Sequence, residues 1–233
     1  RPPAVQIEQY KRDGTLAGRV KFAQTLGNHR ASPSFVARSH YKLRKLSLQL
    51  QGQTPSDIDK LLAPPPAWEG MPTTGNVKIL ALLIDFPEYP HSNSASTIDS
   101  KLYGGGSGGY PYESLHNYYD RSSYGQLKIQ GSTLGWYRTG YNRVSIVQNT
   151  TGRENLIKEV LDDYNAIGHD FTQYDNDGDG AIDYLVVIWS GPHNGWANFW
   201  WGYMTTFQDS GYTVDGKLLE FVPKFDNENF AGT

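Results

Sequence analysis

The longest apolar stretches of the chain predict two strands that are buried on both faces of a sheet. Residues 77–86 (VKILALLIDF) form a near-continuous apolar run with Asp85 near its end, and residues 184–189 (YLVVIW) form a second run. A strand with one face in water alternates apolar and polar residues, whereas a strand covered on both faces does not. These two runs therefore predict the middle of the sheet.

Apolar residues repeat at helical spacing in two other stretches. The clearest is residues 151–167, where residues 151–154 (TGRE) predict a capping box and Gly168 predicts the end of the helix. In a capping box the hydroxyl and the carboxylate each bind a backbone N–H that lacks a partner within the helix. Residues 112–125 have similar spacing and predict a second, shorter helix.

The remaining pattern between these elements predicts strands and a loop. Residues 126–137 alternate and predict a pair of strands that turns at Gly131 and Ser132. Residues 87–109 are rich in glycine and predict a long loop. Helices that alternate with apolar and amphipathic strands indicate an α/β or α+β fold.

The N-terminal part of the chain has weaker signals. Residues 1–30 alternate around the turn signal Asp13-Gly14 and predict a short β-hairpin. Residues 34–51 fit one face of a helix, but their end also alternates like a strand, so both interpretations stay open. Ser56 predicts the start of a short helix that ends before the prolines at 64–66.

A proline-rich stretch at residues 64–75 predicts a boundary between segments 1–70 and 71–233. The first segment has eleven Lys and Arg against five Asp and Glu, a net charge of +6, and the second has ten against nineteen, a net charge of −9. Opposite net charges predict that the two segments attract each other. The larger segment is acidic and lacks a basic-aromatic pattern, which argues against a nucleic-acid partner.

Composition narrows the class of protein further. The chain has no cysteine, which excludes disulfides and a zinc site built from thiolates. No apolar run approaches the ~20 residues that a membrane-spanning helix needs, so we expect no membrane span. The chain begins at Arg1 rather than at Met, and we expect a processed or excised product.

The strongest chemical signal is an acidic loop at residues 174–183 (YDNDGDGAID), directly before the second apolar run. Aspartates at alternate positions place carboxylates around one point, and the two glycines permit the tight turn. Oxygen ligands in this number suit a hard divalent cation, and calcium better than magnesium. The predicted ligands are the side chains of Asp175, Asp177 and Asp179, the carbonyl of Ala181, and Asp183 directly or through water.

This loop differs from a complete EF-hand, because its twelfth position is Val186 rather than a bidentate Glu. It resembles the shorter calcium loops of extracellular repeats, and we expect structural calcium in a secreted, extracellular protein. The plainer alternative is an acidic, glycine-rich turn between a helix and a strand. In that alternative four aspartates would repel one another without a compensating cation.

Five further features admit both a functional and a structural interpretation. His193 lies in a glycine-rich loop after the second buried strand and His116 on a predicted helix, and we expect both to be structural or solvated. Asp85 closes a buried strand and is an additional candidate cation ligand. The aromatic cluster at residues 196–203 either binds sugars or substrate, or belongs to the core. Asn149 begins a glycosylation sequon.

Several blocks of the sequence carry a further signal: residues 70–75 (GMPTTG), 84–87 (IDFP), 114–119 (SLHNYY), 122–127 (SSYGQL), 135–137 (GWY) and 170–188, which include the acidic loop. In the same order, these blocks resemble the immune inhibitor A-like metalloproteases of peptidase family M6. The resemblance covers residues 70–190 well, is looser beyond them, and extends to the N-terminal segment, as a propeptide, mainly by position.

The resemblance implies a secreted zincin with a twisted mixed sheet, an edge strand for extended substrate, and a helix that carries His-Glu-x-x-His. That motif supplies two zinc-binding imidazoles and a Glu that activates water. No histidine of this chain precedes a Glu, and no two are four residues apart. We therefore assign no catalytic residue here and expect zinc only in the complete catalytic domain.

The resemblance thus predicts a propeptide-like segment, 1–70, followed by the N-terminal portion of a catalytic domain, 71–233, that is inactive alone. The expected partners are the chain's own propeptide, the remainder of the catalytic domain, and a protein or peptide substrate. A different class also fits the residues: a calcium-stabilised extracellular binding module that uses surface aromatics on a glycan or a protein. The codons that follow Thr233 discriminate between the two classes.

Overall fold

The computed structural model describes residues 2–27, 33–63, 71–105, 112–219 and 227–231. The chain forms two compact units, of which the first comprises residues 1–28 and 70–233 and the second residues 29–69. The junction at residue 70 lies in the predicted proline-rich boundary. Residues 1–28, however, group with the later residues.

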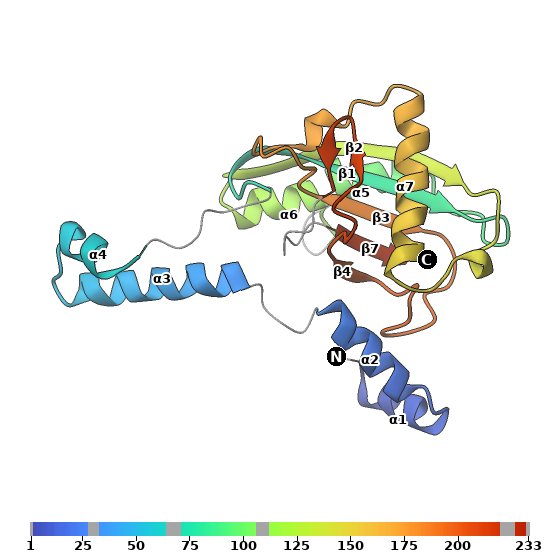
Figure 1. The fold of residues 1–233 in the computed structure, drawn as a ribbon, viewed down its shortest axis with the longest axis horizontal. Coiled ribbons are helices and arrows are strands. Elements are labelled where there is room, and N and C mark those ends of the chain that lie inside the picture. Colours follow the sequence, from blue (N-terminus) through green and yellow to red (C-terminus); the bar gives the residue numbers. More distant parts are fainter. Residues whose placement is uncertain (1, 28–32, 64–70, 106–111, 220–226, 232–233) are drawn as a thin grey trace. The chain divides into compact units, whose positions relative to one another are not determined.

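The first unit has the predicted α+β fold, built on a mixed sheet (Figure 1). Its strand order is β2–β1–β3–β7–β4. Strand β1 is parallel to β2 and β3, and β3 is parallel to β7, whereas β4 is antiparallel to β7. The strands are β1 (Gly75–Asp85), β2 (Leu127–Arg138), β3 (Leu185–Trp189), β4 (Tyr203–Thr205) and β7 (Asn227–Ala231).

Helices cover both faces of this sheet, which explains the two uninterrupted apolar runs. Leu80 and Leu82 of β1 belong to the core cluster that includes the apolar stripe of α7 (Thr150–Ala166). The intervening Ile79 and Ala81 belong to a second cluster, against which α5 (Ala95–Tyr103) and α6 (Leu115–Ser122) pack. Strand β1 is therefore buried on both sides, as the sequence predicted.

The predicted strand pair at residues 126–137 is wrong, because β2 is one continuous strand of twelve residues. Gly131 is the place where a neighbour approaches closely rather than a turn. A Cβ atom on Gly131 would lie 2.0 Å from the Ile79 carbonyl oxygen and 2.7 Å from the Tyr103 ring. The Tyr103 hydroxyl donates to that same carbonyl at 3.2 Å. Because Gly131 has no side chain, the Tyr103 side chain of α5 can lie against this strand and reach the Ile79 carbonyl of β1.

Gly131→Ala is expected to lower the free energy of unfolding by roughly 1–3 kcal/mol, because the added methyl group overpacks a buried contact. Gly140→Ala is the matched control, since a Cβ there meets nothing within 4 Å. Urea denaturation followed by circular dichroism measures both changes. Equal stabilities of the two variants would contradict the close approach at Gly131.

Two further boundaries differ from prediction for local reasons. Helix α7 begins at Thr150, and Asn149 caps it by accepting from the Gly152 N–H at 2.9 Å, so the capping box predicted from Thr151 is wrong. The Glu154 carboxylate instead accepts from the Gln208 N–H at 2.6 Å. The predicted long loop contains α5, which Ser94 caps through the Thr97 N–H at 3.1 Å.

The β-hairpin predicted for residues 1–30 is also wrong, because the described part consists of helices α1 (Ala4–Arg12) and α2 (Leu16–Leu26). Asp13 and Gly14 do form a turn, but it joins two helices. Tertiary packing decides the outcome: Phe22 and Leu26, four residues apart on α2, pack against the main core. Their spacing is helical, and the short alternation before the turn carries less weight.

The second unit contains α3 (Pro33–Leu50) and α4 (Pro55–Leu61). The open choice for residues 34–51 is thereby settled as a helix. Helix α4 has Pro55 in its first turn, and its cap is Thr54 rather than the predicted Ser56. The Thr54 hydroxyl accepts from the Asp57 N–H at 3.3 Å and donates to the Asp57 carboxylate. Ile58 of α4 is fully buried.

Candidate metal centre

The acidic loop connects the short 3-10 helix η2 (Thr172–Tyr174) to the central strand β3. Its two turns use left-handed backbone at Gly178, with φ +78°, and at Gly180, with φ +93°. These conformations disfavour a side chain and explain the two glycines among the aspartates. The loop therefore folds on itself immediately before the most buried part of the sheet.

Three of the predicted ligands come together in this fold. One carboxylate oxygen from each of Asp175, Asp177 and Asp179 lies within 4.8 Å of the other two. Among the residues that the structure describes, these three aspartates form the group of His, Asp or Glu side chains that lie close enough together to share a metal ion. The three carboxylates thus lie close together, and their role as metal ligands stays a prediction.

Asp175 is the most enclosed member of the group. Its Oδ2 accepts from the Gly180 N–H at 3.1 Å and from the Lys217 ammonium at 2.8 Å. Its Oδ1 is buried and has no hydrogen-bond partner among the described residues. Burial acts to raise the pKa of Asp175, but Lys217 and the Gly180 N–H outweigh it and lower the pKa. Asp175 is therefore held as a carboxylate.

Asp183 lies at the inner side of the loop and is fully buried. Its Oδ2 accepts from the backbone N–H and the side-chain amide of Asn176, at 2.6 and 2.9 Å. Its Oδ1 lacks a partner within the described part of the chain. Burial raises the pKa of Asp183 to about 6 despite these hydrogen bonds, and the charges of Asp177 and Asp179 raise it further. A nearby cation would favour the ionised form.

A small hairpin holds the loop from the other side. It consists of β5 (Thr213–Val214) and β6 (Lys217–Leu218). The Leu218 N–H donates to the Gly180 carbonyl at 3.0 Å, and the Ile182 N–H donates to the Leu218 carbonyl at 2.9 Å. Between them, the Ala181 N–H donates to Asp179 Oδ1 at 2.9 Å. The predicted role of the Ala181 carbonyl as a ligand stays a prediction.

The donor set of this loop fits calcium. All side-chain donors are carboxylate oxygens, which hard cations prefer, and calcium tolerates irregular coordination whereas magnesium needs a strict octahedron. Two of these oxygens, on Asp175 and Asp183, are buried without partners among the described residues. Buried polar atoms rarely stay unpaired, and a cation held by Asp175, Asp177 and Asp179 would give the Asp175 carboxylate a partner. Asp183 lies outside this group of three, so its predicted role as a ligand stays a prediction.

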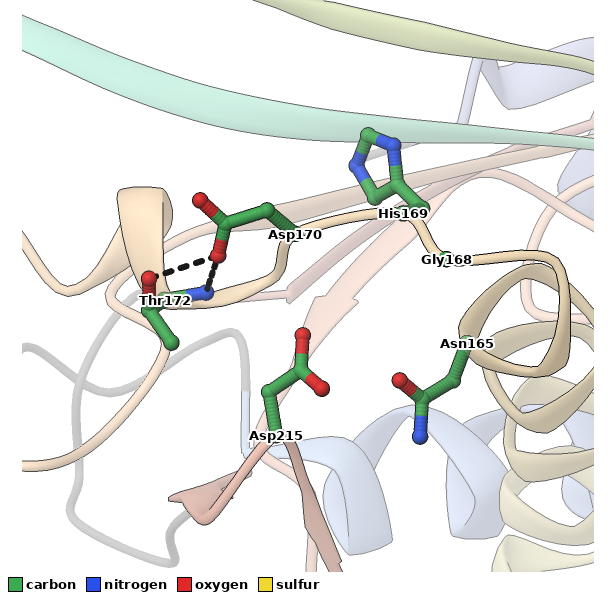
Figure 2. Close-up of a pocket in the computed structure, with 6 residues that line it drawn as sticks. All are labelled: Asn165, Gly168, His169, Asp170, Thr172 and Asp215. Carbon is green, nitrogen blue, oxygen red and sulfur yellow. Dashed lines mark hydrogen bonds between the residues drawn. The ribbon is translucent and has the colours of Figure 1, made fainter.

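An open polar cavity of about 470 Å³ lies beside the segment that leads into the acidic loop (Figure 2). Its acidic side chains already have backbone partners: Asp170 Oδ1 accepts from the Thr172 N–H at 2.9 Å, and Asp215 Oδ2 accepts from the Phe171 N–H at 2.8 Å. Its lining residues are Asn165, Gly168, His169, Asp170, Thr172 and Asp215. The contact between Asp215 and the Phe171 N–H ties the hairpin to the segment that enters the acidic loop.

The described histidines do not gather into a metal-binding group. Four of them lie in separate places, each beside its own hydrogen-bond partner, and none joins a metal-binding group in the described residues. His116 is structural, as expected. The four contacts are His91 Nδ1 with Asp85 at 2.7 Å, His116 Nδ1 with the Ile129 carbonyl at 2.6 Å, His169 Nε2 with the Tyr174 hydroxyl at 2.9 Å, and His193 Nδ1 with the Gly195 N–H at 2.9 Å.

Asp85 is not part of the acidic cluster but anchors a network at the end of β1. It accepts from Arg138 Nε at 2.8 Å and from His91, whose ring stacks on Trp136 at 4.7 Å. Burial acts to raise the pKa of Asp85, but the hydrogen bonds from Arg138 and His91 lower it overall. Sequence reasoning missed this network, and the polar residue in an apolar strand was its one signal.

The aromatic cluster at residues 196–203 belongs mainly to the core. Phe199 is 4% exposed, Trp200 3% and Tyr203 7%. These rings pack around the fully buried Trp189 at the end of β3. The core alternative for this cluster is thus the correct one for its three most buried members.

The chain matches no protein-family model. None of the described helices combines the length and apolar character needed to cross a membrane. Over 150 residues the chain is 28% identical to the pre-pro-metalloprotease PrtV of Vibrio cholerae serotype O1, with the same values in two strains. The match takes in 48% of this chain and 16% of the relative, so the chain spans about a sixth of the length of these curated relatives. The chain is therefore distantly similar to a metalloprotease precursor, which relates it to proteases.

Proposed function

We propose that this chain is the N-terminal portion of a secreted zinc metallopeptidase of the immune inhibitor A-like type, peptidase family M6, that hydrolyses peptide bonds in proteins. The similarity to a metalloprotease precursor carries the proposal. The sequence blocks that resemble the family support the proposal, because they fall on elements that build one sheet and its covering helix. They lie on β1, at the start of α6, along β2, and through the acidic loop into β3.

In this proposal the acidic loop holds a structural calcium ion. Asp175, Asp177, Asp179 and Asp183 supply the carboxylates, and the Ala181 carbonyl supplies a further oxygen. The loop joins η2 to the central strand β3 and is fastened to the β5–β6 hairpin. An ion there would stabilise the junction and take no part in the chemistry of peptide hydrolysis. Calcium is abundant outside cells, which agrees with secretion.

The first 70 residues act as a propeptide in this proposal. Their net charge of +6 opposes the −9 of the remainder, so attraction between the two segments is favourable. A processing protease would reach the chain in the proline-rich stretch between residues 62 and 75. The compact unit of residues 29–69 agrees with a separable element.

The zinc and the catalytic groups belong to a part of the protein outside this chain in the present proposal. The experiment compares the purified 233-residue chain with a longer product of the same gene. We expect neither stoichiometric zinc nor cleavage of casein for the chain, and both for the longer product. Zinc by elemental analysis and peptidase assays with and without a chelator supply the readouts.

The matched control is the longer product with the Glu of its His-Glu-x-x-His motif changed to Gln, which should bind zinc without cleaving casein. A longer product that has neither zinc nor activity would overturn the proposal. Stoichiometric zinc in the 233-residue chain would also contradict it. A stop codon directly after Thr233 would favour the calcium-stabilised binding module instead, although the burial of Phe199, Trp200 and Tyr203 removes most of its candidate surface.

A further inference from the structure

The loop that follows β3 has an unusual backbone. Four of the seven residues from 191 to 197 have positive φ: Gly191 (+99°), Asn194 (+56°), Gly195 (+84°) and Ala197 (+53°). Two of the four are not glycine, and L-residues with side chains adopt this region at an energetic cost. A conformation of this kind persists only where surrounding contacts hold it.

One set of contacts comes from within the sheet domain. Arg143 of the short helix η1 (Arg143–Ser145) is 4% exposed and donates to the Pro192 carbonyl at 3.2 Å. Its guanidinium lies 3.9 Å from the ring centre of Trp200. A Cβ on Gly191 would meet this guanidinium at 2.1 Å. Arg143 thereby fixes the first half of the loop.

The other set comes from the N-terminal helical hairpin, α1 and α2, about 175 residues earlier in the chain. Arg19 of α2 donates to the Trp196 carbonyl at 2.6 Å and to the Asn194 carbonyl at 3.1 Å. The same guanidinium lies 4.1 Å from the ring centre of Tyr10, and its Nε donates to the Thr15 hydroxyl at 3.2 Å. Arg19 is therefore oriented from both sides before it reaches the loop.

The fit between hairpin and loop is close. A Cβ on Gly195 would lie 2.4 Å from the Tyr10 hydroxyl, and Tyr10 is only 5% exposed. Next to this contact, Phe22 packs edge-on against Tyr203 with ring centres 5.7 Å apart. The apolar contacts hold the hairpin against the domain, while Arg19 supplies the directional contact to the left-handed segment.

We propose that Arg19 is a latch that holds the 191–198 loop in its left-handed conformation, so that the N-terminal hairpin controls this loop. The loop begins directly after Trp189, at the carboxyl end of β3, and parallel strands place binding groups at that end of a sheet. While the hairpin is docked, the loop is clamped between Arg143 and Arg19. Loss of the hairpin removes one clamp and releases residues 193–198, which then relax toward unstrained backbone.

The role of Arg19 as a latch rests on these contacts alone. A role of the latch in activating a peptidase rests on the proposed function, because removal of the propeptide would remove Arg19 with it. The two ideas therefore need separate tests. Neither experiment below involves zinc, calcium or peptidase activity, so a failed latch leaves the peptidase proposal standing, and the reverse also holds.

The first experiment measures amide hydrogen exchange in the whole chain. Arg19→Ala is expected to speed exchange of amides 193–198 by roughly tenfold or more, which corresponds to about 1.4 kcal/mol. Arg19→Lys should give a smaller increase, because an ammonium lacks the fork that spans two carbonyls. Arg12→Ala is the matched control, an exposed arginine on the same hairpin. Amides of β1 and β3 should exchange as in the wild type.

Unchanged exchange of amides 193–198 in Arg19→Ala would overturn the latch, and so would an equal effect of Arg12→Ala. If Arg19→Ala unfolds the whole domain, a second experiment decides. A specific protease site is placed between α2 and α3 of the otherwise intact chain, and the hairpin is cut free. Gel filtration should recover the cut hairpin with the domain in both the wild type and Arg19→Lys, because the apolar contacts hold it, whereas amides 193–198 should exchange faster in the cut Arg19→Lys protein. Equal exchange of these amides in the two cut proteins would refute the role of Arg19.

Discussion

Removal of divalent cations is expected to lower the melting temperature of the protein by about 5–10 °C. A ligand that binds only the native state stabilises it by about 2.7 kcal/mol at a hundredfold excess over Kd. In a domain of this size, 1 kcal/mol corresponds to roughly 2–4 °C. The reason for so large an effect is the buried Oδ1 of Asp175, which has no partner among the described residues and belongs to a carboxylate of the three-aspartate cluster.

Asp177→Ala should abolish this response. The Asp177 carboxylate is exposed and accepts from the Asp179 N–H at 3.2 Å, so its loss removes a ligand without emptying the core. Asp163→Ala, an exposed aspartate on α7, is the matched control and should keep the full response to chelator. Calorimetric melts in calcium and in chelator measure the change. Identical melts of the wild type in both buffers would refute a structural calcium ion.

The central strands were predictable because burial on both faces leaves a direct mark in the sequence. Residues of β1 alternate between the α7 side and the α5–α6 side, yet both sides are apolar, so the run is unbroken. The same argument held for β3. The acidic loop was predictable for a similar reason: Asp175, Asp177 and Asp179 are neighbours in sequence, so local backbone geometry alone brings them together.

Two of the incorrect predictions, the turn at Gly131 and the N-terminal β-hairpin, share a different cause. Gly131 suggested a turn, but a glycine is needed there because Tyr103, from another element, packs closely against it. The N-terminal alternation suggested strands, whereas Phe22 and Leu26 pack on a core formed by residues far away in sequence. In both cases a contact between distant segments overrode a weak local preference.

The polar networks beyond the acidic loop had almost no local signal. Asp85 and Arg138 are 53 residues apart, and Arg19 and Trp196 are 177 residues apart. Neither pair can be found from spacing, because each depends on which strands and loops become neighbours. The single polar residue in the apolar run of β1 was a hint that a partner must exist, but it did not identify Arg138 or His91.

Trp189→Ala is expected to cost about 3–5 kcal/mol of unfolding free energy, the range for truncating a large buried aromatic side chain. Trp189 is fully buried at the end of β3, stacks on Phe199 and meets Trp200 edge-on at 5.3 Å. Its indole N–H donates to the Trp200 carbonyl at 3.2 Å. Truncation would leave a cavity at the point where the sheet passes into the 191–198 loop.

The matched control is Trp136→Ala, whose indole lies at the edge of the sheet, stacks on His91 and donates to the Asn93 carbonyl at 2.7 Å. That change should cost about 1 kcal/mol, the size of a ring-stacking contact. Urea denaturation followed by circular dichroism gives both values. A small effect of Trp189→Ala would mean that the aromatic cluster is not the core of this domain. The cluster would then again be available as a binding surface, and the extracellular binding module would regain the support that burial of these rings removes.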